Sequence, residues 1–151
     1  MIRARLNDAL KEAVKAKDQC AVSTLRLTLA ALKDRDIAAR GKGESNGVTD
    51  DEILELLQKM IRQRRESIEA FTKAGRQDLV DKETAEIEVI EHFLPEQLSE
   101  KEMQEAIGEV IQDLDAHTIK DVGRVMGALK QRYPGRMDFG KAGTVVKAEL
   151  A

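Results

Sequence analysis

The chain has 151 residues, of which 42% are hydrophobic, 35% charged and only 3% aromatic, and its formal net charge at pH 7 is -3. The hydrophobic content suffices for a buried core and excludes wholesale disorder, and the negative charge excludes a global field that draws the chain onto nucleic acid or anionic lipid. The single cysteine, Cys20, excludes an internal disulfide. No segment approaches the roughly 20 apolar residues of a membrane span, and the N-terminus lacks the apolar core of a signal peptide. We therefore expect a cytoplasmic location and no membrane partner.

The sequence predicts an all-α fold. Ala, Leu, Glu, Lys, Arg and Gln, which favour helices, dominate the composition, and no alternating run of β-branched or aromatic residues indicates a strand. Apolar residues recur at helical spacing in residues 2–14 and again in residues 22–32. The second of these helices should end before Gly41 to Gly47, a Gly-, Ser- and Asn-containing stretch that indicates a mobile loop.

The third predicted helix is the longest of the chain. Thr49 and Glu52 have the spacing of a capping box at its start, and Gly75 is placed to cap its C-terminus. Arg64 falls near the apolar stripe of this helix. We therefore expect the Arg64 side chain to cross to the acidic helix that follows.

Pro95 marks the predicted domain boundary. The fourth helix begins near Gln77 and should end at Leu94, because proline disfavours helical geometry at the residue before it. We therefore predict an N-terminal helical domain of residues 1–94, a bundle of about four helices, and a C-terminal three-helix subdomain of residues 95–151.

Three amphipathic segments predict the helices of the C-terminal subdomain. Ser99 and Glu102 have the spacing of a second capping box at the start of the first helix. The second begins near Thr118 and should end at Pro134 and Gly135. A last short helix carries three apolar residues, Val145, Val146 and Leu150.

The sequence offers no set of residues for catalysis. The histidines, His92 and His117, lie in different predicted domains, and with one cysteine they lack the short spacings of a zinc site. The glycines of residues 41–47 lack the ending of a phosphate-binding loop. Glutamates gather beside His92, but Val89 stands three residues before it, so the Glu-x-x-His pattern of a di-iron site fails. We expect no catalytic residue, no metal and no cofactor, and interpret the fourth helix as an exposed acidic face.

Charge is segregated along the C-terminal subdomain. Residues 95–115 contain seven acidic residues and one basic residue, whereas residues 116–151 contain seven basic and three acidic residues. A cationic surface of this kind binds phosphates by releasing counterions. The alternative interpretation is that these side chains form an ordinary solvated face or pair with the acidic helix. The candidate nucleic-acid-binding residues are Arg124, Lys130, Arg132, Arg136, Lys141 and Lys147.

Four strings together resemble the YqeY-like proteins of the GatB/YqeY family. They are TLRLTLAALKDRDI (24–37), QRRESIEAFTKAGRQDL (63–79), FLPEQLS (93–99) and DVGRVMGALKQRYPGRMDFGKAGTVVKAEL (121–150). The resemblance implies a two-part helical fold whose C-terminal part is similar to the tail of the B subunit of the glutamyl/aspartyl-tRNA amidotransferase. In those enzymes the tail helps to hold tRNA, and amide transfer takes place in other domains. The resemblance therefore implies tRNA as a partner.

The glycines of the C-terminal subdomain have a physical interpretation. Gly123 and Gly127, four residues apart, allow close approach of another helix, and Gly135 supplies a tight turn after Pro134. The chain departs from many relatives before the last helix, where Ala142 and Gly143 replace Val-Ser. Because glycine is a weaker N-cap than serine, we expect a weakened cap there.

Three hypotheses follow. The first is a non-catalytic module that binds structured tRNA through the six basic residues. The second is a protein-interaction module that docks on an aminoacyl-tRNA synthetase or an amidotransferase through amphipathic helices. The third and least favoured is a carbon–nitrogen ligase with glutamine as amide donor, which requires a nucleophile such as Cys20, a residue with no histidine near it in the sequence.

Overall fold

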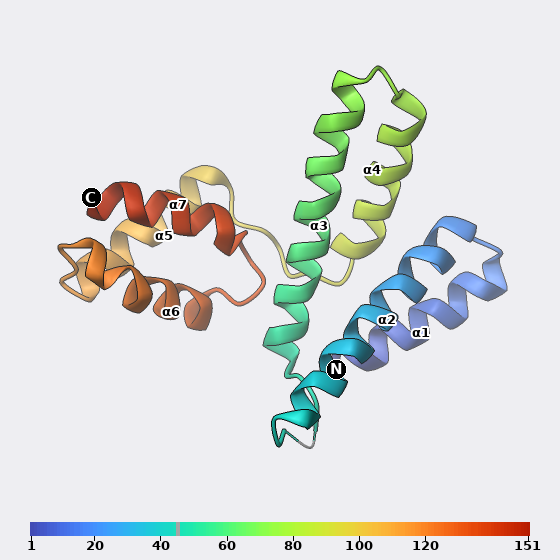
Figure 1. The fold of residues 1–151 in the computed structure, drawn as a ribbon, viewed down its shortest axis with the longest axis horizontal. Coiled ribbons are helices and arrows are strands. Elements are labelled where there is room, and N and C mark those ends of the chain that lie inside the picture. The colour runs from blue at the N-terminus through green and yellow to red at the C-terminus, as the bar shows by residue number, and fades with distance from the viewer. Residues whose placement is uncertain (45) are drawn as a thin grey trace. The chain divides into compact units, whose positions relative to one another are not determined.

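The computed structural model describes residues 1–44 and 46–151 and divides them into two compact units, Met1–Leu94 and Pro95–Ala151. The prediction of an all-helical protein is confirmed, since the described residues form helices and no strand (Figure 1). The predicted loop at 41–47 includes Ser45, which lies outside the described residues. Within the described ranges, no helix is both long and apolar enough to cross a membrane. The helices are α1 (Ile2–Ala16), α2 (Gln19–Gly41), α3 (Asp50–Lys73), α4 (Gln77–Glu91), α5 (Glu100–Asp113), the 3₁₀ helix η1 (Ile119–Asp121), α6 (Val122–Arg132) and α7 (Phe139–Leu150).

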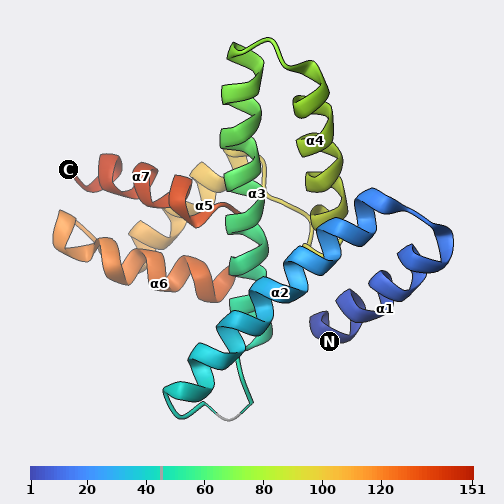
Figure 2. The ribbon, with the colours of Figure 1, turned by 45° about the vertical axis from the view of Figure 1, so that its right-hand side comes forward.

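The N-terminal unit consists of two helical hairpins, α1–α2 and α3–α4 (Figures 1 and 2). In the first, Lys17 takes a left-handed conformation with φ of 59° and ends α1, and the Asp18 carboxylate accepts a hydrogen bond from the Ala21 N–H at 3.1 Å. In the second, Gly75 has φ of 70° just after α3, as predicted for its C-terminal cap. In both hairpins, residues next to the turn therefore end one helix or begin the next.

Both predicted capping boxes are confirmed. The Thr49 hydroxyl accepts from the Glu52 N–H at 3.2 Å, and the Glu52 carboxylate accepts from the Thr49 N–H at 3.2 Å. Ser99 and Glu102 make the same reciprocal pair at 3.1 and 3.0 Å. Each box satisfies backbone N–H groups that the first helical turn leaves without partners.

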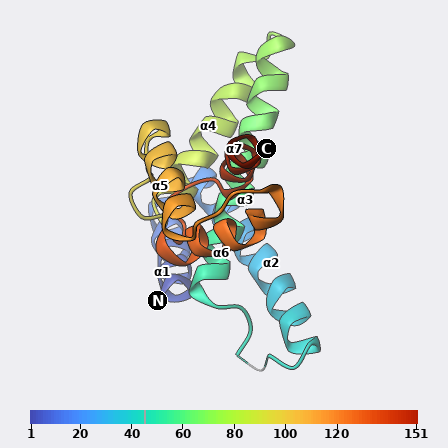
Figure 3. The same cartoon turned by 90° about the vertical axis from the view of Figure 1, so that its left-hand side faces the viewer.

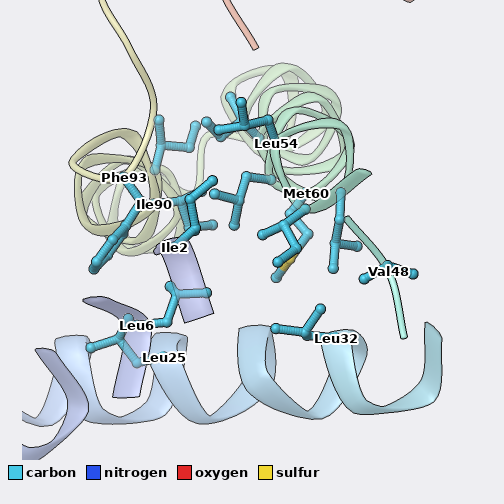
Figure 4. Packing of buried hydrophobic residues seen from close by; sticks show 14 of the residues in the cluster. Ile2, Leu6, Leu25, Leu32, Val48, Leu54, Met60, Ile90 and Phe93 are labelled. Carbon is cyan, nitrogen blue, oxygen red and sulfur yellow. The ribbon is translucent and has the colours of Figure 1, made fainter. Parts of the chain in front are cut away.

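The core of the N-terminal unit lies between all four of its helices. Apolar side chains converge from α1, α2, α3 and α4, and Val48 joins them from the segment before α3 (Figure 4). Removing such side chains from water is the main favourable contribution to folding. The largest that are fully buried are Leu6, Ile53, Leu57 and Ile90.

A buried ion pair joins α3 to α4. Arg64 Nε lies 2.9 Å from Glu86 Oε2, and the two side chains are only 10% and 15% exposed. Arg64 also donates to the Met60 carbonyl at 3.3 Å. The prediction that Arg64 crosses to the acidic helix is therefore confirmed.

The C-terminal unit packs α5, α6 and α7 around a smaller core (Figure 3). Pro134 and Gly135 form a turn after α6, in which Gly135 has φ of 72°, and the Arg136 N–H donates to the Tyr133 carbonyl at 3.2 Å. Proline followed by a glycine with positive φ is the order that a type II turn requires. The largest fully buried side chains of this unit are Ile107, Val110, Val125, Leu129 and Val146.

Three predicted helix boundaries differ from the structure. The fourth helix ends at Glu91, not at Leu94, so three residues separate it from Pro95. The helix expected from Thr118 begins with the short η1 before α6. The expected weakening of the last N-cap is wrong, because the cap is Asp138, which accepts from the Gly140 N–H at 2.9 Å, and Gly143 lies inside α7.

An ion pair also holds the end of the loop between α2 and α3. Asp36 is buried on α2 and forms a two-fold hydrogen-bonded pair with the Arg3 guanidinium. Asp36 also accepts from the Val48 N–H at 3.0 Å, and Arg3 donates to the Val48 carbonyl at 2.9 Å. Gly47 packs directly against this pair, since a methyl group built on it would lie 2.4 Å from Asp36 Oδ1.

This packing predicts unequal effects of alanine at two glycines of the same loop. Gly47 and Gly43 both have positive φ, 78° and 94°, but among the described residues no atom lies within 4 Å of a methyl group built at Gly43. Gly43→Ala should therefore cost about 1 kcal/mol of backbone strain, and Gly47→Ala should cost roughly 1–3 kcal/mol more because Asp36 must move. Urea unfolding of both variants tests this, and equal destabilisation would contradict it.

The same pair predicts a pH dependence. The hydrogen bonds from Arg3 and from the Val48 N–H lower the pKa of Asp36 to about 2, below its ordinary value of 3.8. The pair therefore stabilises the fold fully above pH 4, and this contribution, about 2 kcal/mol, is lost as the pH falls toward 2. Between pH 4 and 2 the wild type should lose more unfolding free energy than Asp36→Asn. Parallel losses in the two proteins would contradict the assignment.

Candidate functional site

The six candidate nucleic-acid-binding residues occupy different faces of the C-terminal unit. Arg124, Lys130 and Arg132 lie on α6, Arg136 follows the turn after it, and Lys141 and Lys147 lie on α7. At about 100° per residue, Arg124 and Lys130 point roughly 120° apart around the helix axis, and Lys141 and Lys147 are separated by a similar angle. The structure therefore does not bring the six side chains to one face.

Both arginines of α6 are paired with carboxylates. Arg124 Nη2 lies 3.1 Å from Asp121 Oδ1 and donates to the Leu114 carbonyl at 3.2 Å. Arg132 Nη1 lies 2.8 Å from Asp113 Oδ2 at the end of α5. The Asp121 carboxylate also accepts from the backbone N–H groups of His117 and Thr118, which hold its pKa below the ordinary value.

The remaining basic residues have varied surroundings. Lys141 Nζ lies 3.5 Å from Glu100 Oε1 at the start of α5. The half-buried Arg136 donates from Nε to the Glu96 carbonyl at 3.0 Å. Lys130 Nζ lies 6.0 Å from the centre of the Phe139 ring. Lys147 is exposed in the last turn of α7, where the negative end of the helix dipole stabilises a positive charge.

These contacts correct the picture of an uncompensated cationic surface. Arg124, Arg132 and Lys141 each lie within ion-pair distance of a carboxylate, and residues 95–151 contain ten acidic and eight basic residues. Exposed ion pairs are weak, so a phosphate can displace them. The net charge of this unit is therefore slightly negative, and it does not by itself attract an RNA backbone.

The packing role expected for two of the glycines is not observed. Gly123 and Gly127 are exposed on α6, and a methyl group built on either would meet no other atom within 4 Å. Close helix approach therefore does not explain them. Gly135 is buried, and its positive φ and its carbonyl, which accepts from Gln97 Nε2 at 2.7 Å, account for a glycine in that turn.

A groove in the N-terminal unit was not visible in the sequence. It has a volume of about 460 Å³ and lies where residues of α1, α2 and α4 meet. Cys20 and His92 both line it, although they are far apart in the sequence. Among the described residues, no hydrogen bond joins the two side chains, and no group of three or more His, Cys, Asp and Glu residues is arranged to hold a metal ion. The groove therefore has the features of a binding surface, with apolar walls and few polar groups.

Comparison with known proteins identifies the relatives of the chain. A model of the YqeY-like proteins matches residues 3–150. Altered inheritance of mitochondria protein 41 of Lachancea thermotolerans is 41% identical over 91 residues, which cover 60% of this chain and 46% of that protein. The protein of the same name from Pyrenophora tritici-repentis is 31% identical over 134 residues, covering 87% and 71%. An uncharacterized protein of Schizosaccharomyces pombe is 33% identical over 98 residues, covering 65% and 76%.

Two facts about these relatives bear on the sequence-based expectations. The chain spans about half the length of the Lachancea relative and of its namesake from Eremothecium gossypii. The relatives named altered inheritance of mitochondria protein 41 are mitochondrial by their names, which contradicts the expected cytoplasmic location. A single cysteine and the lack of an apolar membrane span fit more than one reducing compartment, so they were not sufficient grounds for that expectation.

The carboxylate pairs of the C-terminal unit predict a gain in RNA affinity when they are removed. Asp113→Asn combined with Glu100→Gln frees Arg132 and Lys141, so tRNA affinity at low salt should rise by roughly three- to tenfold. Fluorescence anisotropy of labelled tRNA measures the change.

The matched control for this experiment is Glu105→Gln combined with Glu109→Gln. Both glutamates are exposed on α5, outside the ion pairs described above, so the control changes net charge by the same amount without freeing a cation. An equal rise in tRNA affinity for both double variants would show that net charge, and not pairing, limits binding.

Proposed function

The chain belongs to the family of YqeY-like proteins, and we propose that it acts as a non-catalytic adaptor that docks on a protein of the tRNA-handling machinery. The partners that fit this proposal are an aminoacyl-tRNA synthetase or a tRNA amidotransferase. The link to tRNA comes from the resemblance of the C-terminal unit to the tail of the amidotransferase B subunit.

The observation that carries this proposal is the internal pairing of the basic side chains. Arg124, Arg132 and Lys141 contact carboxylates of their own unit, and the six candidate residues point in different directions. Proteins that bind a nucleic-acid backbone instead gather unpaired Lys and Arg side chains on one surface. Docking on a protein requires no such surface, which favours the adaptor over direct tRNA binding.

The arrangement around Cys20 supports a non-catalytic role. A thiol nucleophile is activated by a neighbouring base, and the base is oriented by a third group. Cys20 and His92 share the groove without a hydrogen bond between them among the described residues. The exposed His92 side chain contacts the edge of the Phe93 ring, with 5.4 Å between ring centres.

The proposal predicts a protein complex that does not depend on RNA. The purified full-length chain, mixed with purified tRNA amidotransferase or with a purified aminoacyl-tRNA synthetase, should elute with one of these enzymes in size-exclusion chromatography before and after ribonuclease treatment. In the same buffer at physiological salt, deacylated tRNA alone should not shift the chain.

The direct tRNA-binding hypothesis predicts the opposite pattern. The chain would bind tRNA alone, the logarithm of its affinity would fall steeply with the logarithm of salt concentration, and ribonuclease would release the enzyme. That result would overturn the adaptor proposal.

A further inference from the structure

The groove of the N-terminal unit has an apolar floor built from three helices. Ala9 of α1, Ala21 and Leu25 of α2, and Ala85 and Val89 of α4 line it. Three of these five residues are alanines, and each comes from a different helix. Short side chains on all three walls leave room for the backbone of another helix, which is how an amphipathic helix docks in a groove.

The rim of the groove carries acidic side chains. Asp18 lies at one side, at the N-terminus of α2, and the exposed Glu88 lies on α4. Apart from His92, the residues that line the groove include no basic residue. The rim therefore favours a positively charged occupant.

The charge of α4 extends this preference. The helix contains six acidic residues and one basic residue. Glu86 and Glu91 are paired with Arg64 and Arg65 of α3, at 2.9 and 3.2 Å, and Asp78 lies 2.9 Å from Arg76. Glu88 stands on the groove side of α4 and takes part in none of these pairs. The acidic face expected from the sequence is thus partly used for packing and partly presented at the groove.

Arg5 borders the groove at its Phe93 end. Its guanidinium lies 5.5 Å from the centre of the Phe93 ring and donates to the His92 carbonyl at 3.2 Å. These contacts tie the Arg5 guanidinium to His92 and Phe93, and the acidic residues of the lining are Asp18 and Glu88. A second groove, between α2 and α3, has Asp34, Arg35 and Lys59 in its lining, so its mixed charge selects no class of partner.

We propose that the groove between α1, α2 and α4 receives an amphipathic helix of a partner protein, with small or apolar residues on one face and Lys or Arg residues beside them. This inference rests on the proposed function and names the surface that performs it. The apolar face of the helix packs against the alanine-lined floor, and its basic residues lie near Asp18 and Glu88.

Cys20 provides a reporter for the occupant. It is the single cysteine of the chain, it is half-buried, and it lines the groove. A helix seated in the groove should therefore slow the reaction of the Cys20 thiol with a disulfide reagent such as DTNB. The probe is an amphipathic peptide of about 16 residues, about four helical turns, made of leucine, alanine and lysine, and its counterpart has glutamate in place of lysine.

The lysine peptide should slow the thiol reaction in a saturable manner, and the glutamate peptide should not. Glu88→Lys should weaken binding of the lysine peptide by roughly three- to tenfold at low salt, and Ala85→Arg, which fills the floor, should weaken it by at least about tenfold. Glu66→Lys is the control, because Glu66 is exposed on α3 and does not line the groove. Circular dichroism checks that each variant is folded.

Three results would overturn the proposal. Equal protection by both peptides would show that charge does not select the occupant, and protection unaffected by Glu88→Lys and Ala85→Arg would place the peptide elsewhere. If no peptide is present and Cys20 becomes more protected as the protein concentration rises, the occupant of the groove is a second copy of the chain.

The same variants separate this inference from the proposed function. If an enzyme partner binds wild type, Glu88→Lys and Ala85→Arg equally, the adaptor proposal stands and the groove is not its docking site. If the lysine peptide binds as described but neither enzyme binds the chain, the groove assignment stands and the proposed partners are wrong.

Discussion

Within each of the two units, ion pairs connect basic and acidic side chains of different segments. Arg3 and Asp36 fix the end of the loop before α3, Arg64 and Glu86 join α3 to α4, and Arg132 and Asp113 join α6 to α5. A chain with 35% charged residues and 3% aromatic residues has few aromatic side chains with which to fix helix positions. The buried pairs fix the positions of the helices that they join, although removing their charges from water costs free energy. The exposed pairs reduce the electrostatic field around the protein.

This use of charge is the physical basis on which we prefer the adaptor hypothesis. A basic residue that is paired within its own unit contributes less to an outward field than an unpaired one. The C-terminal unit has a slight excess of acidic residues, and its six candidate cations lie on different faces. The N-terminal unit, by contrast, presents an apolar groove with an acidic rim. The physical properties of the chain therefore favour contact with a protein over contact with a phosphate backbone.

Local rules predicted much of the fold, and contacts between distant residues account for what they missed. Capping boxes at Thr49 and Ser99, the glycine after α3 and the apolar spacing of each helix depend on residues within one or two turns, and they appear as expected. The surroundings of the candidate site residues and of the groove depend on contacts that such local rules do not describe. Arg132 pairs with Asp113, which lies 19 residues away in the sequence. The groove is lined by alanines from three helices, and because alanine is common in helices its presence in the sequence does not indicate a binding site.

Hydrogen–deuterium exchange of the full-length chain, free and mixed with the enzyme partner and its tRNA, tests where the assembly contacts this protein. The account predicts slower exchange in the segments that build the groove, residues 18–25 and 85–93, with exchange in α6 and α7 unchanged and no effect of ribonuclease. Slower exchange confined to α6 and α7, and abolished by ribonuclease, would contradict it.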